Sequence, residues 1–119
     1  MAQTDFRQAL QDREEISITV KGRRTGKAIT LPVWFALDGK ILLLLPVRGS
    51  RSQWFRNVQA DPTMTIRAGR GHLTVTARPV TDATSVQAVV QKFRSKYTPE
   101  EVARYYTGFD AAVQMRIES

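Results

Sequence analysis

The chain has 119 residues and a mass of 13.4 kDa, which is the size of a single domain. It contains no cysteine and one histidine, His72, so a disulfide scaffold and thiol chemistry are excluded and a histidine-based zinc site is not expected. Its net charge is +7, and residues 21–78 hold eleven basic and only two acidic residues. This basic middle predicts an anionic partner, with a merely solubilising surface as the alternative.

Apolar periodicity and turn residues predict helices and short strands along the whole chain. In chain order they are a helix over 6–13, strands over 16–20, 28–37 and 41–47, a helix over 52–60, strands over 63–67 and 72–80, a helix from a cap at Asp82 or Thr84 through Tyr97, a helix from Thr98 to near Gly108, and a sixth strand over 111–117. Pro32 predicts an edge or a bulge in the second strand. The apolar run after the Asp38-Gly39 turn predicts a third strand that is buried on both faces.

Most strand connections are expected to be antiparallel hairpins. The predicted fold class is therefore α+β, mainly β with peripheral helices, in the form of a small, partly open β-barrel. Residues 1–119 are expected to form one domain. The longest apolar run has strand length, and the first residues lack the apolar core of a secretory signal, so we expect no transmembrane segment and a cytoplasmic protein.

The first candidate site is the basic loop between the first two strands. It carries two glycines, four cations and one hydroxyl, as Lys21, Gly22, Arg23, Arg24, Thr25, Gly26 and Lys27. Glycine allows a ligand to approach the backbone closely, and arginine can bind phosphate through two hydrogen bonds. The loop is not a Walker motif, because the spacing before its Gly-Lys pair differs and no helix follows. An anion site and a solvated hairpin tip both remain open.

The second candidate site is a polar loop that leads into the helix expected over 52–60. The loop runs from Arg48 through Gly49 and Ser50 to residue 52, and free amides at a helix start favour anions. Trp54 and Asn57 lie three residues apart on one face of that helix. Trp54 could belong to the core or contact a ligand, and Asn57 could be solvated or bind a heterocycle.

Three tyrosines near the end of the chain form a weaker group. Tyr97, Tyr105 and Tyr106 are expected to pack together, and the alternative is that a hydroxyl reaches a ligand, which makes Tyr105 and Tyr106 the catalytic candidates. No paired carboxylates and no set of metal ligands are expected. Nucleic acid is disfavoured as a partner, because Trp34 and Phe35 are the only aromatic residues on the expected strands.

Several of these motifs occur in an order that resembles a known family. They are the segments 19–27, 31–33, 38–39, 47–49, 54–57 and 60–62, which read TVKGRRTGK, LPV, DG, VRG, WFRN and ADP. Together they resemble the deazaflavin-dependent nitroreductase-like family of split β-barrel flavin and deazaflavin oxidoreductases, which is related in fold to pyridoxamine-phosphate oxidase. The resemblance covers roughly residues 16–67.

The resemblance implies a split barrel that binds coenzyme F-420 and transfers a hydride from the reduced coenzyme to an electron-poor, small-molecule acceptor. By analogy, Arg23, Arg24 and Lys27 would hold the phosphate and anionic tail, with Thr25 among them. The deazaflavin would be lined by Val47, Arg48, Gly49 and Ser50, with Trp54 and Asn57 beside it.

Two departures from the family pattern leave alternatives open. The segment between Gly49 and Trp54 has only four residues and lacks the His-Pro-Ala that often precedes the tryptophan. The end of the chain also lacks the usual Tyr-x-x-x-Thr-x-Arg-x-[Ile/Val]-Pro pattern. FMN or a haem breakdown product could therefore replace the deazaflavin, and a non-catalytic cofactor carrier or a nucleic-acid-binding barrel is a third hypothesis.

The strand expected over 28–37 also predicts a homodimer. Ile29, Leu31, Val33 and Phe35 alternate along one face, and Trp34 points to the other. Two apolar faces need two packing partners, the barrel core and a second one. The C-terminal helices could be that second partner, but we favour a twofold dimer, as in split-barrel relatives.

Overall fold

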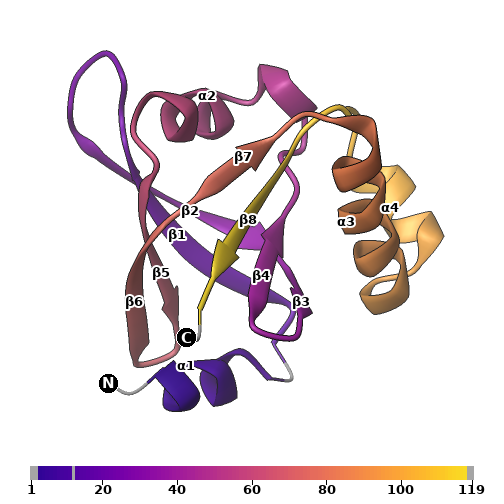
Figure 1. Cartoon of the computed structure of the whole chain (residues 1–119), viewed down its shortest axis with the longest axis horizontal. Helices are drawn as coiled ribbons and strands as arrows, with labels where there is room; N and C mark the ends of the chain where they lie inside the picture. The colour runs from indigo at the N-terminus through magenta and orange to yellow at the C-terminus, as the bar shows by residue number, and fades with distance from the viewer. Residues whose placement is uncertain (1–2, 12, 118–119) are drawn as a thin grey trace.

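The computed structural model describes residues 3–11 and 13–117, and these form two four-stranded antiparallel sheets with helices around them (Figure 1). The strand orders are β2-β1-β5-β6 and β3-β4-β8-β7. The strands are β1 (Glu15–Lys21), β2 (Ala28–Trp34), β3 (Ala36–Asp38), β4 (Ile41–Leu44), β5 (Thr63–Ala68), β6 (Gly71–Thr76), β7 (Arg78–Val80) and β8 (Ala112–Arg116). The helices are α1 (Gln3–Leu10), α2 (Gln53–Ala60), α3 (Ala83–Lys96) and α4 (Pro99–Tyr105), with a short 3-10 turn η1 (Gly49–Arg51).

Two of the predicted strands are each split between the sheets, so the prediction of five or six strands was wrong. The run over 28–37 breaks at Phe35, where β2 ends against β1 and β3 begins against β4. The run over 72–80 breaks in the same way at Ala77, between β6 and β7. Both breaking residues are buried, so the chain crosses from one sheet to the other without leaving the core. The sixth strand is present as β8.

The third predicted strand is buried on both faces, as expected, but it is shorter than residues 41–47. Leu42 and Leu44 of β4 pack between the sheets, and Leu43 and Leu45 pack against α3 and α4. Pairing ends at Leu44, before Pro46, whose nitrogen cannot donate a ladder hydrogen bond. The protein thus has two apolar clusters, one between the sheets and one under the C-terminal helices.

Helices α1 and α2 lie at opposite ends of the strands, and α3 and α4 lie together against the sheet that contains β4 and β8 (Figure 1). Helix α1 begins and ends about three residues before the helix predicted over 6–13. It ends at Leu10 because the backbone turns there to enter β1. Asp12 lies outside the described residues. Helix α3 begins after Asp82, whose carboxylate accepts a hydrogen bond from the Ser85 N–H at 2.9 Å. Of the described helices, none is long and apolar enough to cross a membrane.

Helix α4 begins at its predicted Thr98 cap but ends at Tyr105, before Gly108. The N–H groups of Thr107 and Gly108 instead donate to the carbonyl of Val47, at 2.8 and 3.2 Å. Helix α2 follows Ser52 as predicted, although the Ser52 hydroxyl accepts a hydrogen bond from the Arg48 N–H and does not cap the helix. Residues 47–52 are therefore held by the C-terminal segment as well as by their own backbone.

Candidate functional site

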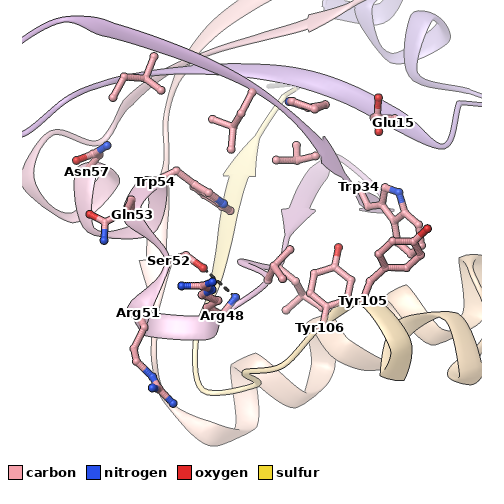
Figure 2. Close-up of a pocket in the computed structure, with 16 residues that line it drawn as sticks. Glu15, Trp34, Arg48, Arg51, Ser52, Gln53, Trp54, Asn57, Tyr105 and Tyr106 are labelled. Atoms are coloured by element: carbon pink, nitrogen blue, oxygen red, sulfur yellow. Dashed lines mark hydrogen bonds between the residues drawn. The ribbon is translucent and has the colours of Figure 1, made fainter.

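A cavity of about 580 Å³ opens between β2, the segment that joins β4 to α2, and the end of α4 (Figure 2). Strand β2 forms its apolar wall, and the two other segments supply most of its polar groups. The lining residues are Glu15, Ile29, Leu31, Pro32, Val33, Trp34, Leu45, Val47, Arg48, Arg51, Ser52, Gln53, Trp54, Asn57, Tyr105 and Tyr106. A cavity of this size with few polar groups is typical of a site for a cofactor or small molecule.

One end of the cavity is polar and lies over α2 (Figure 2). Gln53 and Asn57 are one helical turn apart and share a face of that helix. Arg23 reaches them from the basic loop, with its Nη1 2.8 Å from Asn57 Oδ1 and its Nη2 2.8 Å from Gln53 Oε1. The Arg23 backbone N–H also donates to Asn57 Oδ1, at 3.2 Å. The basic loop is thus attached to the floor of the cavity.

The segment over Val47–Arg51 is attached to the end of the chain. The Asp110 carboxylate accepts from both the backbone N–H and the hydroxyl of Ser50, at 2.8 and 2.6 Å. These two hydrogen bonds hold the pKa of Asp110 below its ordinary value. Ser50 is therefore engaged with Asp110, while Arg48 and Arg51 on either side of it line the cavity.

The opposite end of the cavity is aromatic. The Trp34 ring stacks on Tyr97 at a centroid distance of 4.2 Å and meets Tyr105 edge-on at 4.6 Å. Tyr106 packs against both Trp34 and Phe93, and burial raises the pKa of its hydroxyl well above the ordinary range, so that the hydroxyl stays protonated. Figure 2 shows the Tyr106 hydroxyl pointing into the cavity.

The structure brings together six of the twelve candidate residues named from the sequence. Those that line the cavity are Val47, Arg48, Trp54, Asn57, Tyr105 and Tyr106. Arg23 lies directly behind the lining, whereas Arg24, Thr25 and Lys27 lie on the exposed hairpin. Gly49 and Ser50 lie in the segment that borders the cavity and contact Asp110.

Sequence reasoning missed the β2 wall and the polar residues Glu15 and Gln53, whereas Arg51 and Ser52 belong to the polar loop that it named as the second candidate site. The available signal for Gln53 was its spacing of four from Asn57, which places both amides on one helix face. For β2 the signal was its two apolar faces, which sequence reasoning assigned to the core and to a partner subunit and not to the wall of a cavity. The described residues contain no group of three or more His, Cys, Asp or Glu side chains that could hold a metal ion.

Comparisons with known proteins bear on this geometry. A family model described as F420H(2)-dependent quinone reductase matches residues 3–118. The fold is similar to that of an F420-H2 dependent reductase, with a TM-score of 0.68 and 19% identity over 87% of this chain and 95% of that one. It is also similar to a structure described as a domain-swapped dimer, with a TM-score of 0.69 and 20% identity over 90% and 83% of the two chains.

A third similar structure is a Listeria innocua protein described as a candidate pyridoxamine 5′-phosphate oxidase. Its TM-score is 0.68 at 9% identity, over 95% of this chain and 90% of that one. At such identities the likeness concerns the fold alone. It confirms the expected split β-barrel related to pyridoxamine-phosphate oxidase.

Proposed function

The chain belongs to the F420H(2)-dependent quinone reductase family, which makes it an oxidoreductase with coenzyme F-420 as its cofactor; on this basis we propose that the cavity binds the coenzyme and that the protein reduces an electron-poor organic acceptor such as a quinone. The resemblance to deazaflavin-dependent oxidoreductases is thereby confirmed. The observation that carries the proposal is the polarity of the cavity, with cationic and amide groups at one end and aromatic rings at the other.

The residues present fit a coenzyme that joins a flat ring to an anionic chain. Arg48, Arg51 and the amides of α2 would hold the anionic part, because guanidinium groups and N–H donors bind phosphate oxygens well. The β2 wall and Trp54 would cover the ring system and exclude water from it. Arg24 and Lys27, on the exposed hairpin beyond the cavity, would attract the tail through their charge rather than by direct contact inside it.

When bound, the reduced coenzyme supplies a hydride, and the protein must position the acceptor and stabilise the charge that develops on it. Reduction of a quinone places negative charge on an oxygen. The Tyr106 hydroxyl is a neutral donor at the aromatic end of the cavity, suited to such an oxygen. Its raised pKa makes it a poor acid, so we assign it a hydrogen-bonding role rather than proton transfer.

We further propose that residues 1–119 act as one domain and that the protein is a homodimer joined through β2. Strand β2 lies at the edge of its sheet, and the Ile29 side chain is 41% exposed. Trp34, on the opposite face, already packs against residues of α3 and α4, so the C-terminal helices cover that face. A second copy would cover the edge that remains; the similar structure described as a domain-swapped dimer supports a homodimer, while the β2 contact rests on the exposed edge.

Fluorescence titration with F-420 tests the cofactor, and oxidation of reduced F-420 by a water-soluble benzoquinone tests the reaction. We expect micromolar binding and quinone-dependent turnover. Tyr106→Phe should lower kcat about tenfold or more, with little change in the dissociation constant of F-420. Tyr105→Phe, at the other tyrosine of the cavity, is the comparison and should lower kcat less, because Tyr105 is 55% exposed and Tyr106 is buried. Binding of FMN in place of F-420, or binding without turnover, would contradict the proposal.

A further inference from the structure

Arg23 uses its donors on two side-chain amides of α2. Its Nη1 and Nη2 donate to Asn57 Oδ1 and Gln53 Oε1, and its backbone N–H also donates to Asn57 Oδ1. A guanidinium group and a backbone N–H can donate but cannot accept. The amide atoms that face Arg23 must therefore be the oxygens, and both NH2 groups must face away from it. Amide oxygen and nitrogen atoms are hard to tell apart by their positions alone, but here the orientation of both amides follows from Arg23, which can only donate.

The NH2 group of Asn57 faces the cavity. Asn57 is only 4% exposed, and no described group accepts a hydrogen bond from its Nδ2. Among the described residues, however, every fully buried side-chain nitrogen or oxygen has a partner, so Nδ2 must reach open space. Because Asn57 lines the cavity, that open space is the cavity itself (Figure 2). A buried side chain thus aims an unpartnered donor into the site.

The other polar groups at this end of the cavity also offer donors. Arg48 contributes a guanidinium group and Trp54 an indole N–H, whereas the Arg51 side chain points away from Trp54 and Asn57 (Figure 2). The Ser52 oxygen accepts from the Arg48 N–H at 2.9 Å with one of its two lone pairs, and its hydrogen remains available to donate. Glu15, the carboxylate that lines the cavity, lies at the opposite, aromatic end (Figure 2).

We propose that Arg23 is a positioning residue that makes the two α2 amides offer only donors to the cavity, so that this subsite recognises a part of the bound coenzyme that has only acceptor atoms. This inference rests on the proposed function and deepens it. It differs from the role that the family resemblance implies, in which Arg23 itself holds the phosphate. The acceptor-only part could be the phosphate of F-420 or the ring carbonyls, and the two sources are separable by experiment.

The first test uses F-420 titrations of variants that separate charge from orientation. Arg23→Lys keeps the charge, but its single ammonium cannot hold both amides, so affinity should fall about tenfold. Arg67→Lys, at an exposed arginine of β5 that does not line the cavity, is the matched control and should bind within about twofold of the wild type. Asn57→Asp keeps its partnership with Arg23 but presents an oxygen to the cavity, so affinity should fall about tenfold or more while thermal stability is maintained. Full affinity in Arg23→Lys or Asn57→Asp would overturn the proposal.

A double-mutant cycle separates positioning from direct contact. If Arg23 acts through Asn57, the affinity loss in the Arg23→Ala, Asn57→Ala double variant should be clearly smaller than the product of the two single losses. Multiplicative losses would mean that Arg23 contacts the ligand by itself and would overturn the proposal. Repeating the Asn57→Asp titration with the deazariboflavin core, which lacks phosphate and tail, identifies the source. A loss seen only with F-420 assigns the phosphate, and an equal loss with both ligands assigns the ring carbonyls.

A ligand-free measurement keeps the inference independent of the proposed function. In the NMR spectrum of the wild type, the Asn57 and Gln53 side-chain NH2 groups should each give one resolved pair of signals. In Arg23→Lys these pairs should shift and broaden as the amides become free to rotate, while the Arg24→Lys spectrum should match the wild type. Unchanged signals in Arg23→Lys would overturn the inference. Failure of the wild type to bind F-420 would instead overturn the proposed function, and the NMR comparison would still decide the role of Arg23.

Discussion

The Tyr97 hydroxyl lies at the point where the chain crosses between the sheets, and its removal should be costly. The Phe35 N–H donates to Tyr97 Oη at 3.1 Å, and this oxygen lies 2.9 Å from the carbonyl of Phe35 and 2.6 Å from that of Glu14. One hydroxyl therefore joins α3 to the ends of β1 and β2. Phe35 is only 1% exposed, so Tyr97→Phe leaves its N–H buried without an acceptor.

The expected cost follows from that unpartnered donor. A buried N–H left without a partner costs about 1–3 kcal/mol, and the loss of one oxygen atom opens almost no cavity. We therefore expect Tyr97→Phe to lower the free energy of unfolding by about 2 kcal/mol at pH 7. For a chain of 119 residues this corresponds to a fall of roughly 8 °C in Tm.

The same substitution should change how stability depends on pH. Burial raises the pKa of Tyr97 from 10.0 to about 12. Below pH 10 the phenol is protonated in both folded and unfolded chains, and its contribution is fully present. Between pH 10 and 12 the unfolded chain ionises first, so the wild type loses about 1 kcal/mol of stability for each pH unit. Tyr97→Phe has no phenol at this position, so the gap between the two proteins should narrow by about 1 kcal/mol from pH 10 to pH 11.

Urea unfolding at pH 7, 9, 10 and 11 measures both effects. Tyr105→Phe is the control, because its exposed ring should give a change within about 0.5 kcal/mol. F-420 affinity should survive in Tyr97→Phe, since the aromatic stack on Trp34 needs only the ring. A stability gap below about 0.5 kcal/mol at pH 7, or one that stays constant from pH 9 to 11, would refute the reasoning.

Three further predictions follow from other parts of the structure. Ile29→Lys on the exposed edge strand should give a monomer in light scattering, whereas His72→Lys on the opposite edge strand β6 should leave the assembly unchanged. Gly49→Ala should destabilise the protein by about 1–3 kcal/mol in urea unfolding, because Gly49 has φ of 61° and an added Cβ would clash with Asp110; wild-type stability would contradict this. Asp82→Ala should lower Tm at neutral pH, because the cap is lost. The cap holds the pKa of the Asp82 carboxyl below 3.8, so the difference in Tm between the two proteins should disappear as pH falls through that depressed pKa. A Tm difference that persists in acid would contradict this.

The sequence predicted those elements whose signals are local. The caps at Asp82 and Thr98, the basic hairpin and the doubly buried β4 each depend on a few neighbouring residues, and all are present. The sheet crossings at Phe35 and Ala77 were missed, because alternation continues through both residues and does not record which sheet a strand joins. Only tertiary pairing distinguishes one long strand from two short ones.

The candidate site shows the same division between local and tertiary signals. The sequence marked residues 47–57 as a site by their glycine, cations and helix start, and four of its candidates there line the cavity: Val47, Arg48, Trp54 and Asn57. It could not distinguish Arg23 from Arg24. Both are cations on one loop, but only Arg23 lies within hydrogen-bonding distance of the amides of α2. That difference depends on how the hairpin packs over a helix some thirty residues later, which no local pattern encodes.

The backbone itself fixes the spacing between the two ends of the cavity. The Val47 carbonyl accepts two backbone hydrogen bonds from the residues that follow Tyr106, and Arg48 forms a parallel bridge with Gly108. A Cβ on Gly108 would fall 2.6 Å from the carbonyl carbon of Arg48, so only glycine allows the two segments to approach this closely. The donor-lined segment and the tyrosine-bearing segment therefore form one unit, not two independent loops. A ligand that spans the cavity thus meets cationic and aromatic groups already held at a set distance, which lowers the entropic cost of binding.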